Sequence, residues 1–350
     1  MSKLSQVPYQ QAIEDWNNFL SNYSGIAPFS FNPSLFKFYQ IHFNWKPYYI
    51  MVFRNNRLCG VLPLINTTKA WVSIPHFSYG GFLSDGTYDL DYKTLCEGAI
   101  SGLDTKEPGF YRYDDGNPVF QNNEKIFIRT LSNKGGVLKS EKETSFICLP
   151  ENIGEFNLML NSNLRRKINK AENSGIVIKY GGYDLLPDFY NVYASNISTL
   201  GSLNYGFSYF EDLITAWEMG ICNVFVVYDN NIPVGSAILM GHKGFYENTY
   251  FATLKGERKK YISDFLHWKM IEFVYSQERI SNNVIYSFGR STSGSGVYKY
   301  KNHWPVENHD LYLYTNYPDI RSKGWLYNIW GILPKFITKP LGASLIRHLY

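Results

Sequence analysis

The chain has 350 residues, which is more than one small domain needs, so we expect two domains. Aromatic residues make up 17% of the sequence, and this supply of core-forming side chains excludes an intrinsically disordered chain. The formal net charge of +4 is too small for a protein that binds nucleic acid over its whole surface, although local basic patches remain open.

Cysteine and histidine spacing argues against a metal or disulfide framework. The four cysteines lie far apart with no CxxC pair, and the seven histidines form no HxxxH or HExxH array. We therefore expect no metal site and no resident cofactor. Residues 1–8 contain no apolar signal region, and no run reaches the ~18 apolar residues of a membrane span. The sequence predicts a soluble cytoplasmic protein.

Taken in chain order, the first half is predicted to mix helices and strands. Residues 10–45 read as helical, because apolar side chains recur at helical spacing. A strand over 48–53, a polar turn over 54–57 and a strand over 58–64 predict a hairpin. Further elements are expected as a helix over 88–103 and strands over 109–113 and 125–131.

The second half begins with a basic amphipathic helix over 163–173, which Gly175 is expected to end. A strand over 223–228, the turn Asp229-Asn230-Asn231 and a strand over 232–240 predict a second hairpin. The other expected helices are 186–200, 210–219 and 264–277, and the other expected strands are 245–253, 284–288 and 310–315.

The two predicted hairpins resemble each other. Residues 52–61 and 227–236 each read as a strand, a short Asn-containing turn and a strand with an early glycine. Their separation is close to half the chain. We therefore predict an α/β fold with a mixed sheet, built as two copies of one unit over residues 1–155 and 156–320.

The last segment, residues 321–350, differs from both halves. It carries five Lys or Arg and no acid, together with two Trp and other apolar side chains. Such a basic amphipathic tail fits peripheral contact with a membrane surface. A closing helix that packs onto the domains is the slightly favoured alternative.

A candidate anion site follows the strand over 284–288. This strand is expected to end at Gly289-Arg290 and to open into a Gly/Ser turn, whose backbone N–H groups over 291–296 converge. The Arg290 fork with Lys299 and Lys301 would then hold a phosphate, a carboxylate or a developing oxyanion. A plain strand and loop with one surface arginine is the alternative.

Two other segments are basic. In the helix over 163–173, Arg166 and Lys170 share a face that would suit tRNA phosphates or a lipid-linked pyrophosphate. Residues 253–264 contain one glycine and four Lys or Arg, which argues against the usual glycine-rich CoA cradle and allows a phosphate-rich donor such as tRNA. Solvated surfaces are the alternative for both segments.

Four stretches of the second half resemble the Fem-type, lipid-II-aminoacyltransferase-like proteins, and more narrowly the FemAB-like proteins encoded with exopolysaccharide and exosortase systems. The stretches are 164–175, 193–210, 264–268 with Asp264 and Trp268, and 288–304 with Tyr300, Lys301 and Trp304. In the first half, Tyr79-Gly80-Gly81 also looks like the family pattern. Tyr300 stands where the family usually has Phe, and Pro305 where Gly is common.

This resemblance points to the GNAT (acyl-CoA N-acyltransferase) superfamily and implies a tandem GNAT-like fold with Lys301 in a cleft between the domains. In well-studied members, an aminoacyl-tRNA donates its aminoacyl group to an amine of a cell-wall precursor. The predicted activity is therefore acyl or aminoacyl transfer to an amino group of a cell-envelope precursor, as in peptidoglycan, or of a surface glycan such as an exopolysaccharide. Aminoacyl-tRNA or acyl-CoA would be the co-substrate.

Residues are assigned to this reaction as follows. The predicted catalytic residues are Lys301 and Arg290, which would stabilise the oxyanion, since such stabilisation usually contributes most to the catalysis of acyl transfer. The predicted substrate-binding residues are Ser291, Lys299, Tyr300, Trp304, Arg166, Lys170, Tyr79, Gly80, Asp264 and Trp268. Candidate bases are Asp264, Glu247 and His303, although each is equally explained as a structural polar residue.

Two alternatives to a Fem-like enzyme stay open. One is an acyl-CoA-dependent N-acyltransferase that acts on a nucleotide- or lipid-linked amino sugar. The other is a non-catalytic GNAT-like binding protein in a polysaccharide assembly complex.

Overall fold

The structure is a computed structural model that describes residues 2–23, 26–67, 71–81, 83–84, 109–114, 136–200, 202–277 and 284–315. The expected helix 88–103, the strand 125–131 and the tail 321–350 lie outside these residues. Contacts group the described chain into two compact units. Among the described residues, the first unit holds those up to Ser145, Arg290–Ser295 and Asn308–Thr315. The second unit holds those in Phe146–Gly289 and Gly296–Glu307. The predicted domain boundary at residue 155 stays a prediction.

The first unit combines short helices with a mostly antiparallel sheet. Its helices are α1 (Tyr9–Asn22) and α2 (Pro33–Phe38), with the helical turns η1 (Phe29–Phe31) and η2 (Tyr39–Phe43). Its strands are β1 (Ser2–Pro8), β2 (Lys46–Arg54), β3 (Arg57–Asn66), β4 (Trp71–Val72), β5 (Leu83–Ser84), β6 (Gly109–Asp114) and most of β13 (Glu307–Thr315). The described strands follow the order β1-β2-β3-β4-β6-β13, and β5 pairs with β3.

The second unit carries more helix. Its helices are α5 (Ile153–Met159), α6 (Ser162–Glu172), α7 (Leu186–Thr199), α8 (Phe207–Ala216), α9 (Ile262–Ser276) and α10 (Gly296–Lys301), with η3 (Tyr183–Leu185) and η4 (Lys255–Lys260). Its strands are β8 (Val177–Gly181), β9 (Ile221–Asp229), β10 (Ile232–His242), β11 (Phe245–Thr253) and most of β12 (Val284–Thr292). In the sheet, these strands lie in the order β12-β11-β10-β9-β8. The chain passes between the units within β7 (Gly136–Leu149) and within β12.

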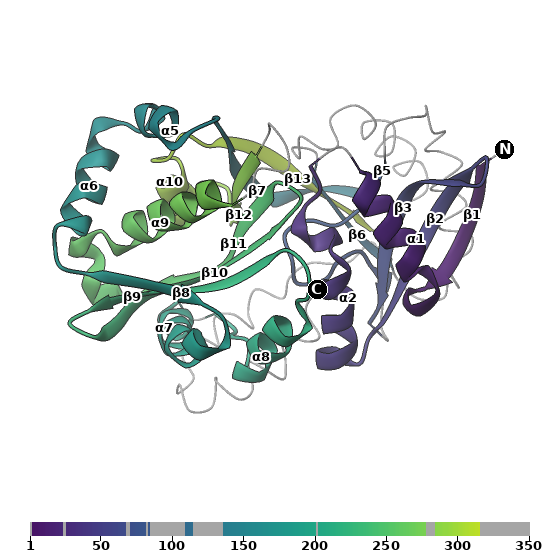
Figure 1. The fold of residues 1–350 in the computed structure, drawn as a ribbon, viewed down its shortest axis with the longest axis horizontal. Coiled ribbons are helices and arrows are strands. Elements are labelled where there is room, and N and C mark those ends of the chain that lie inside the picture. Colours follow the sequence, from purple (N-terminus) through teal and green to yellow (C-terminus); the bar gives the residue numbers. More distant parts are fainter. Residues whose placement is uncertain are drawn as a thin grey trace. The chain divides into compact units, whose positions relative to one another are not determined.

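Helices cover both faces of the second unit's sheet. In Figure 1, α6 and α9 lie on one face, and α7 and α8 lie on the other. Phe225 and Val227 of β9 join the core cluster that includes Leu266 of α9, while the alternating residue Val226 is buried as well. A sheet covered on both faces requires apolar residues at successive positions, which explains the continuous apolar run in β9.

Most of the predicted elements are confirmed. Both hairpins are present, β11 spans Phe245–Thr253 as predicted, and α6 is followed by Gly175 at a φ of 79°. The chain has the mixed α/β architecture expected from the sequence. Helix α8 lies earlier than predicted, because the backbone is already extended at Trp217.

The prediction that a strand ends at Phe288 is wrong. Strand β12 continues to Thr292, because Gly289 takes a φ of 67° and kinks the strand without ending it. The expected Gly/Ser turn is reduced to residues 293–295, and α10 begins at Gly296. Ser291 is therefore a strand residue, so the backbone N–H groups over 291–296 do not form one turn.

Within the described ranges, no helix combines the length and the apolar character that crossing a membrane requires. Across the same ranges, no group of three His, Cys, Asp or Glu side chains is arranged to hold a metal ion.

Candidate active site

The candidate site is built on the kink in β12. The Gly289 N–H donates to Ser287 Oγ at 3.0 Å, and the Gly289 carbonyl accepts a hydrogen bond from Lys301 Nζ at 2.8 Å. Ser287 Oγ donates to Glu247 Oε2 at 3.5 Å. Lys301 is only 4% exposed, so its ammonium lies inside the second unit. The left-handed backbone at position 289 favours glycine, and this turns the carbonyl toward the lysine.

The kink lies just beyond the point where β11 and β12 stop pairing. Their parallel ladder joins Phe245–Glu247 to Ile285–Ser287 and goes no further. Beyond that point, the Asn248 side chain replaces the backbone as the hydrogen-bond donor to β12. With its amide nitrogen facing β12, it donates to the carbonyls of Ser287 at 3.0 Å and Phe288 at 3.3 Å. A side-chain amide therefore satisfies backbone groups that the ladder leaves open.

Helix α9 adds a buried histidine that sequence reasoning did not single out. His267 Nδ1 lies 2.9 Å from the Tyr286 hydroxyl, and the imidazole stacks on Phe251 with the ring centroids 4.2 Å apart. Burial lowers the pKa of His267 well below its ordinary value, and the nearby charge of Lys301 lowers it further. The imidazole is therefore neutral near pH 7. Its position between Leu266 and Met270 on the apolar side of the helix was the available sequence signal.

Three side-chain polar atoms next to this cluster are buried with unused hydrogen-bonding capacity. Asp264 Oδ1, Tyr300 OH and Trp304 Nε1 have no hydrogen-bond partner among the described residues. Burial raises the pKa of Asp264, and the charge of Lys167 opposes that shift. Burial also raises the pKa of Tyr300, and the carboxylate of Asp264 adds to it. A buried carboxyl with a raised pKa has the character expected of a general base.

The other residues predicted at the anion site are divided between the two units. Arg290 and Ser291 belong to the first unit, whereas Lys299 and Lys301 belong to the second. Ser291 Oγ is buried without a partner among the described residues, and Lys299 is exposed. Convergence of Arg290 and Lys301 on one anion stays a prediction.

Local packing holds three of the other predicted substrate-binding residues, Tyr79, Gly80 and Trp268. The Tyr79 hydroxyl is buried and hydrogen-bonded to Thr144 Oγ1. A Cβ at Gly80 would lie 2.5 Å from the Ser73 carbonyl oxygen, so the close backbone approach alone explains this glycine. In the second unit, Trp268 stacks on Phe156 with ring centroids 6.0 Å apart. Substrate contact by these residues stays a prediction.

The basic helix presents part of its charge to solvent. Arg166 and Lys170 are exposed, and Arg166 Nη2 donates to Asn163 Oδ1 at 2.9 Å. The ammonium groups of Lys167 and Lys170 lie 5.8 Å and 5.5 Å from the centroid of the Tyr261 ring, which immediately precedes α9. The cation–π contacts link α6 to the start of α9.

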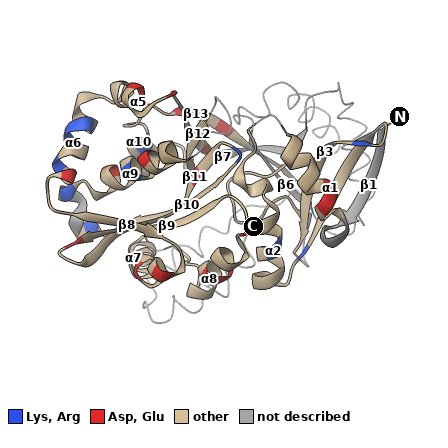
Figure 2. Cartoon of the chain, viewed as in Figure 1, with Lys and Arg blue, Asp and Glu red and all other residues tan. Residues whose placement is uncertain are grey.

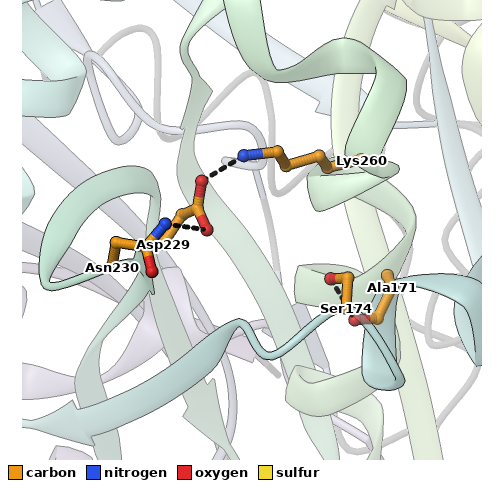
Figure 3. A network of polar contacts seen from close by, with 5 residues as sticks. All are labelled: Ala171, Ser174, Asp229, Asn230 and Lys260. Atoms are coloured by element: carbon orange, nitrogen blue, oxygen red, sulfur yellow. Dashed lines mark hydrogen bonds and ion pairs between the residues drawn. The ribbon is translucent and has the colours of Figure 1, made fainter.

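The second predicted basic segment forms η4, and one of its lysines already has an acidic partner. Figure 3 shows the Lys260 ammonium paired with the Asp229 carboxylate at the turn between β9 and β10, where Asn230 Nδ2 also donates to Asp229 Oδ1 at 3.4 Å. This ion pair links η4 to the β9–β10 turn.

Comparison with known proteins supports the fold. No family model and no curated protein matches the sequence. Among solved structures, FemX has a TM-score of 0.65 at 13% identity and covers 94% of this chain and 100% of its own. L-PGS from Bacillus licheniformis has a TM-score of 0.55 at 12% identity, covering 91% of this chain and 95% of its own. A tandem GNAT protein from the clavulanic acid biosynthesis pathway has a TM-score of 0.52 at 9% identity, covering 91% and 100%.

These similarities cover nearly the whole chain, and at such low identities they show the fold alone. The chain has a mixed α/β fold of the tandem GNAT-like type, and this prediction is confirmed.

Proposed function

We propose that this protein is a Fem-like acyl- or aminoacyltransferase that forms an amide on an amino group of a cell-envelope or surface-polysaccharide precursor. The observation that carries the proposal is the buried network of Lys301, Gly289, Ser287 and Glu247. Two of its members, Gly289 and Lys301, belong to the stretch 288–304 that resembles the Fem-type family, in a chain whose fold is similar to that of FemX.

The proposed reaction is a direct transfer between the two substrates, without a covalent bond to the protein. The acceptor nitrogen attacks the donor carbonyl, and the bond to the donor's ester oxygen or thioester sulfur breaks. The nitrogen loses a proton, and the leaving oxygen or sulfur takes one up. In this proposal, Arg290 meets the developing oxyanion and Lys301 fixes the strand that carries it. Asp264, whose pKa is raised by burial, is the favoured acceptor for the proton.

The direct test is transfer of a radiolabelled aminoacyl group from charged tRNA to amine-bearing envelope precursors. We expect Arg290→Ala to lower transfer by at least about 100-fold, the scale of removing one oxyanion-stabilising group. We expect Lys301→Met to lower transfer as well, because the strand that carries Arg290 loses its hydrogen bond to the lysine. Lys269→Met is the matched control, because this lysine pairs with Glu172 and Glu272 on the surface of α9 and α6. Full transfer by Arg290→Ala, whose side chain is part-exposed, would contradict the proposal even if Lys301→Met failed to fold.

A donor panel separates the two enzyme hypotheses. The fold is similar to that of a tandem GNAT protein, so an acyl-CoA donor is the alternative to aminoacyl-tRNA. We expect charged tRNA to raise the melting temperature, and acetyl-CoA and longer acyl-CoAs to leave it unchanged. Protection by acyl-CoA alone would replace our first proposal with the acyl-CoA-dependent one, and no transfer with any donor would favour the binding-protein alternative.

A further inference from the structure

An unusual combination of exposed side chains lies where α5 meets α6. Leu158 is 75% exposed and Met159 is 47% exposed, although both follow directly on the buried core of α5. The helix is held by Phe156, which is fully buried, and by Leu160, which ends it. Leu158 and Met159 are thus large apolar side chains that the core of the second unit does not use.

Cations lie on the helix that follows this apolar pair in the chain. Helix α6 buries Leu164, Ile168 and Ala171, so its opposite face, with Arg166 and Lys170, points to solvent. Figure 2 shows the resulting concentration of positive charge along α6. The two helices are joined closely, because only two residues separate them and Arg165 Nη1 reaches the Asn157 carbonyl at 3.5 Å.

The acidic residues of α5 and α6 do not outweigh the cations, because the two helices carry two acids, Glu155 and Glu172, against four Lys or Arg. Glu172, the acid of α6, is bound to Lys269 at 2.7 Å. Glu155 is exposed one helical turn before Leu158 and accepts a hydrogen bond from Asn152 at 2.7 Å.

We propose that Leu158, Met159, Arg166 and Lys170, here called the α5–α6 corner, dock the protein on an anionic lipid bilayer. The apolar pair would enter the headgroup region while the two cations meet lipid phosphates, the pairing of chemistries that holds peripheral proteins at a membrane. A nucleic acid would account for the cations and leave Leu158 and Met159 unexplained. The contact is independent of the acyl-transfer chemistry, and would bring the enzyme to acceptors made at a membrane.

The test is flotation of the full-length protein with vesicles containing 30% phosphatidylglycerol in phosphatidylcholine. The wild type is expected to bind these vesicles and not pure phosphatidylcholine. Leu158→Ser with Met159→Ser is expected to weaken partitioning on the order of tenfold. Arg166→Gln with Lys170→Gln removes two charges, each worth about fivefold near an anionic surface.

Controls make the outcome specific. Leu200 and Ile232 are 60% and 62% exposed on other elements, so Leu200→Ser with Ile232→Ser should bind vesicles like the wild type. Equal losses in this control and in the Leu158/Met159 variant would overturn the proposal. So would absence of wild-type binding, or binding of tRNA that depends on Arg166 and Lys170 without any vesicle binding.

The same variants separate this inference from the proposed activity. The Leu158→Ser, Met159→Ser protein should keep wild-type transfer to a water-soluble acceptor while losing vesicle binding. If the variant loses vesicle binding and keeps transfer, the docking surface is supported. If the wild type also fails to transfer, the proposed function is contradicted, and the vesicle result still tests the docking surface.

Discussion

The hairpin β2–β3 of the first unit and the hairpin β9–β10 of the second unit share one design. Each turn places two asparagines in the left-handed region, Asn55 and Asn56 at φ values of 49° and 62°, and Asn230 and Asn231 at 48° and 62°. Two successive left-handed residues form the tight turn that matches the twist of antiparallel strands, and asparagine tolerates that conformation better than most residues.

The likeness continues beyond the turn. In each hairpin one residue of the second strand is unpaired, Cys59 in the first and Val234 in the second, and a glycine follows it. A bulge at the same offset from the same turn is unexpected for unrelated hairpins, because bulges are specific features of a strand. The two hairpins are therefore equivalent pieces of the repeated unit that the sequence suggested.

The surroundings of the two glycines differ. Gly60 pairs with Ser84 of the short strand β5. At Gly235, a Cβ would lie 2.6 Å from Ile262 Cγ2, so the first residue of α9 rests directly on the hairpin. The second unit thus uses the shared scaffold to seat the helix that carries Asp264 and His267. In the second unit, this contact therefore joins the hairpin to the helix of the candidate site.

The largest expected effect on stability comes from adding a side chain at Gly235, where the hairpin contacts Ile262. Gly235→Ala should lower the free energy of unfolding of the second unit by about 2 kcal/mol, because an added methyl must displace Ile262 or the strand. In urea titrations, adding Ile262→Ala to Gly235→Ala should cost less than Ile262→Ala alone, since the smaller residue relieves the clash. Strict additivity of the two losses would mean that the hairpin does not seat α9 in this way.

A second prediction concerns the histidine that α9 brings into the core. The pKa of His267 is lowered in the folded state, so the unfolded chain binds the proton more tightly and stability falls as pH drops below about 6.5. The contribution of His267 to this loss should approach about 1.4 kcal/mol per pH unit. His267→Gln should show a correspondingly flatter profile between pH 6.5 and the folded pKa.

His242 provides an internal reference for that experiment. Burial lowers its pKa to about 4, so it contributes a loss of the same sign in the wild type and in His267→Gln. Only the difference between the two profiles reports His267. Identical profiles in urea unfolding from pH 5 to 7 would show that the imidazole is not buried as a neutral group.

Many elements of the fold were predictable from local sequence. Both Asn-Asn turns, the exact span of β11 and the glycine after α6 were predictable, because they depend on turn chemistry and periodicity within a short window. The path of β12 was not. Gly289-Arg290-Ser291 reads as a loop, yet strand pairing continues past the glycine, which only kinks the chain.

The candidate site was predictable in its residues more than in its geometry. Lys301 stood out through a family resemblance, but the sequence did not indicate that its ammonium would bind the Gly289 carbonyl. The contact between His267 and Tyr286 joins residues 19 positions apart on a helix and a strand. Such contacts depend on tertiary packing, which no local pattern specifies.

The smallest expected effect tests whether the two hairpins are equivalent. Asn56→Ala and Asn231→Ala each place a residue that disfavours the left-handed region at the second turn position, and each should cost about 1 kcal/mol. Asn56→Gly and Asn231→Gly are the matched controls, because glycine adopts this conformation freely. Hydrogen exchange of the hairpin amides would localise each loss to its own turn. A loss in one hairpin with none in the other would show that the repeated turns, despite their matching φ values, contribute differently to the stability of the two units.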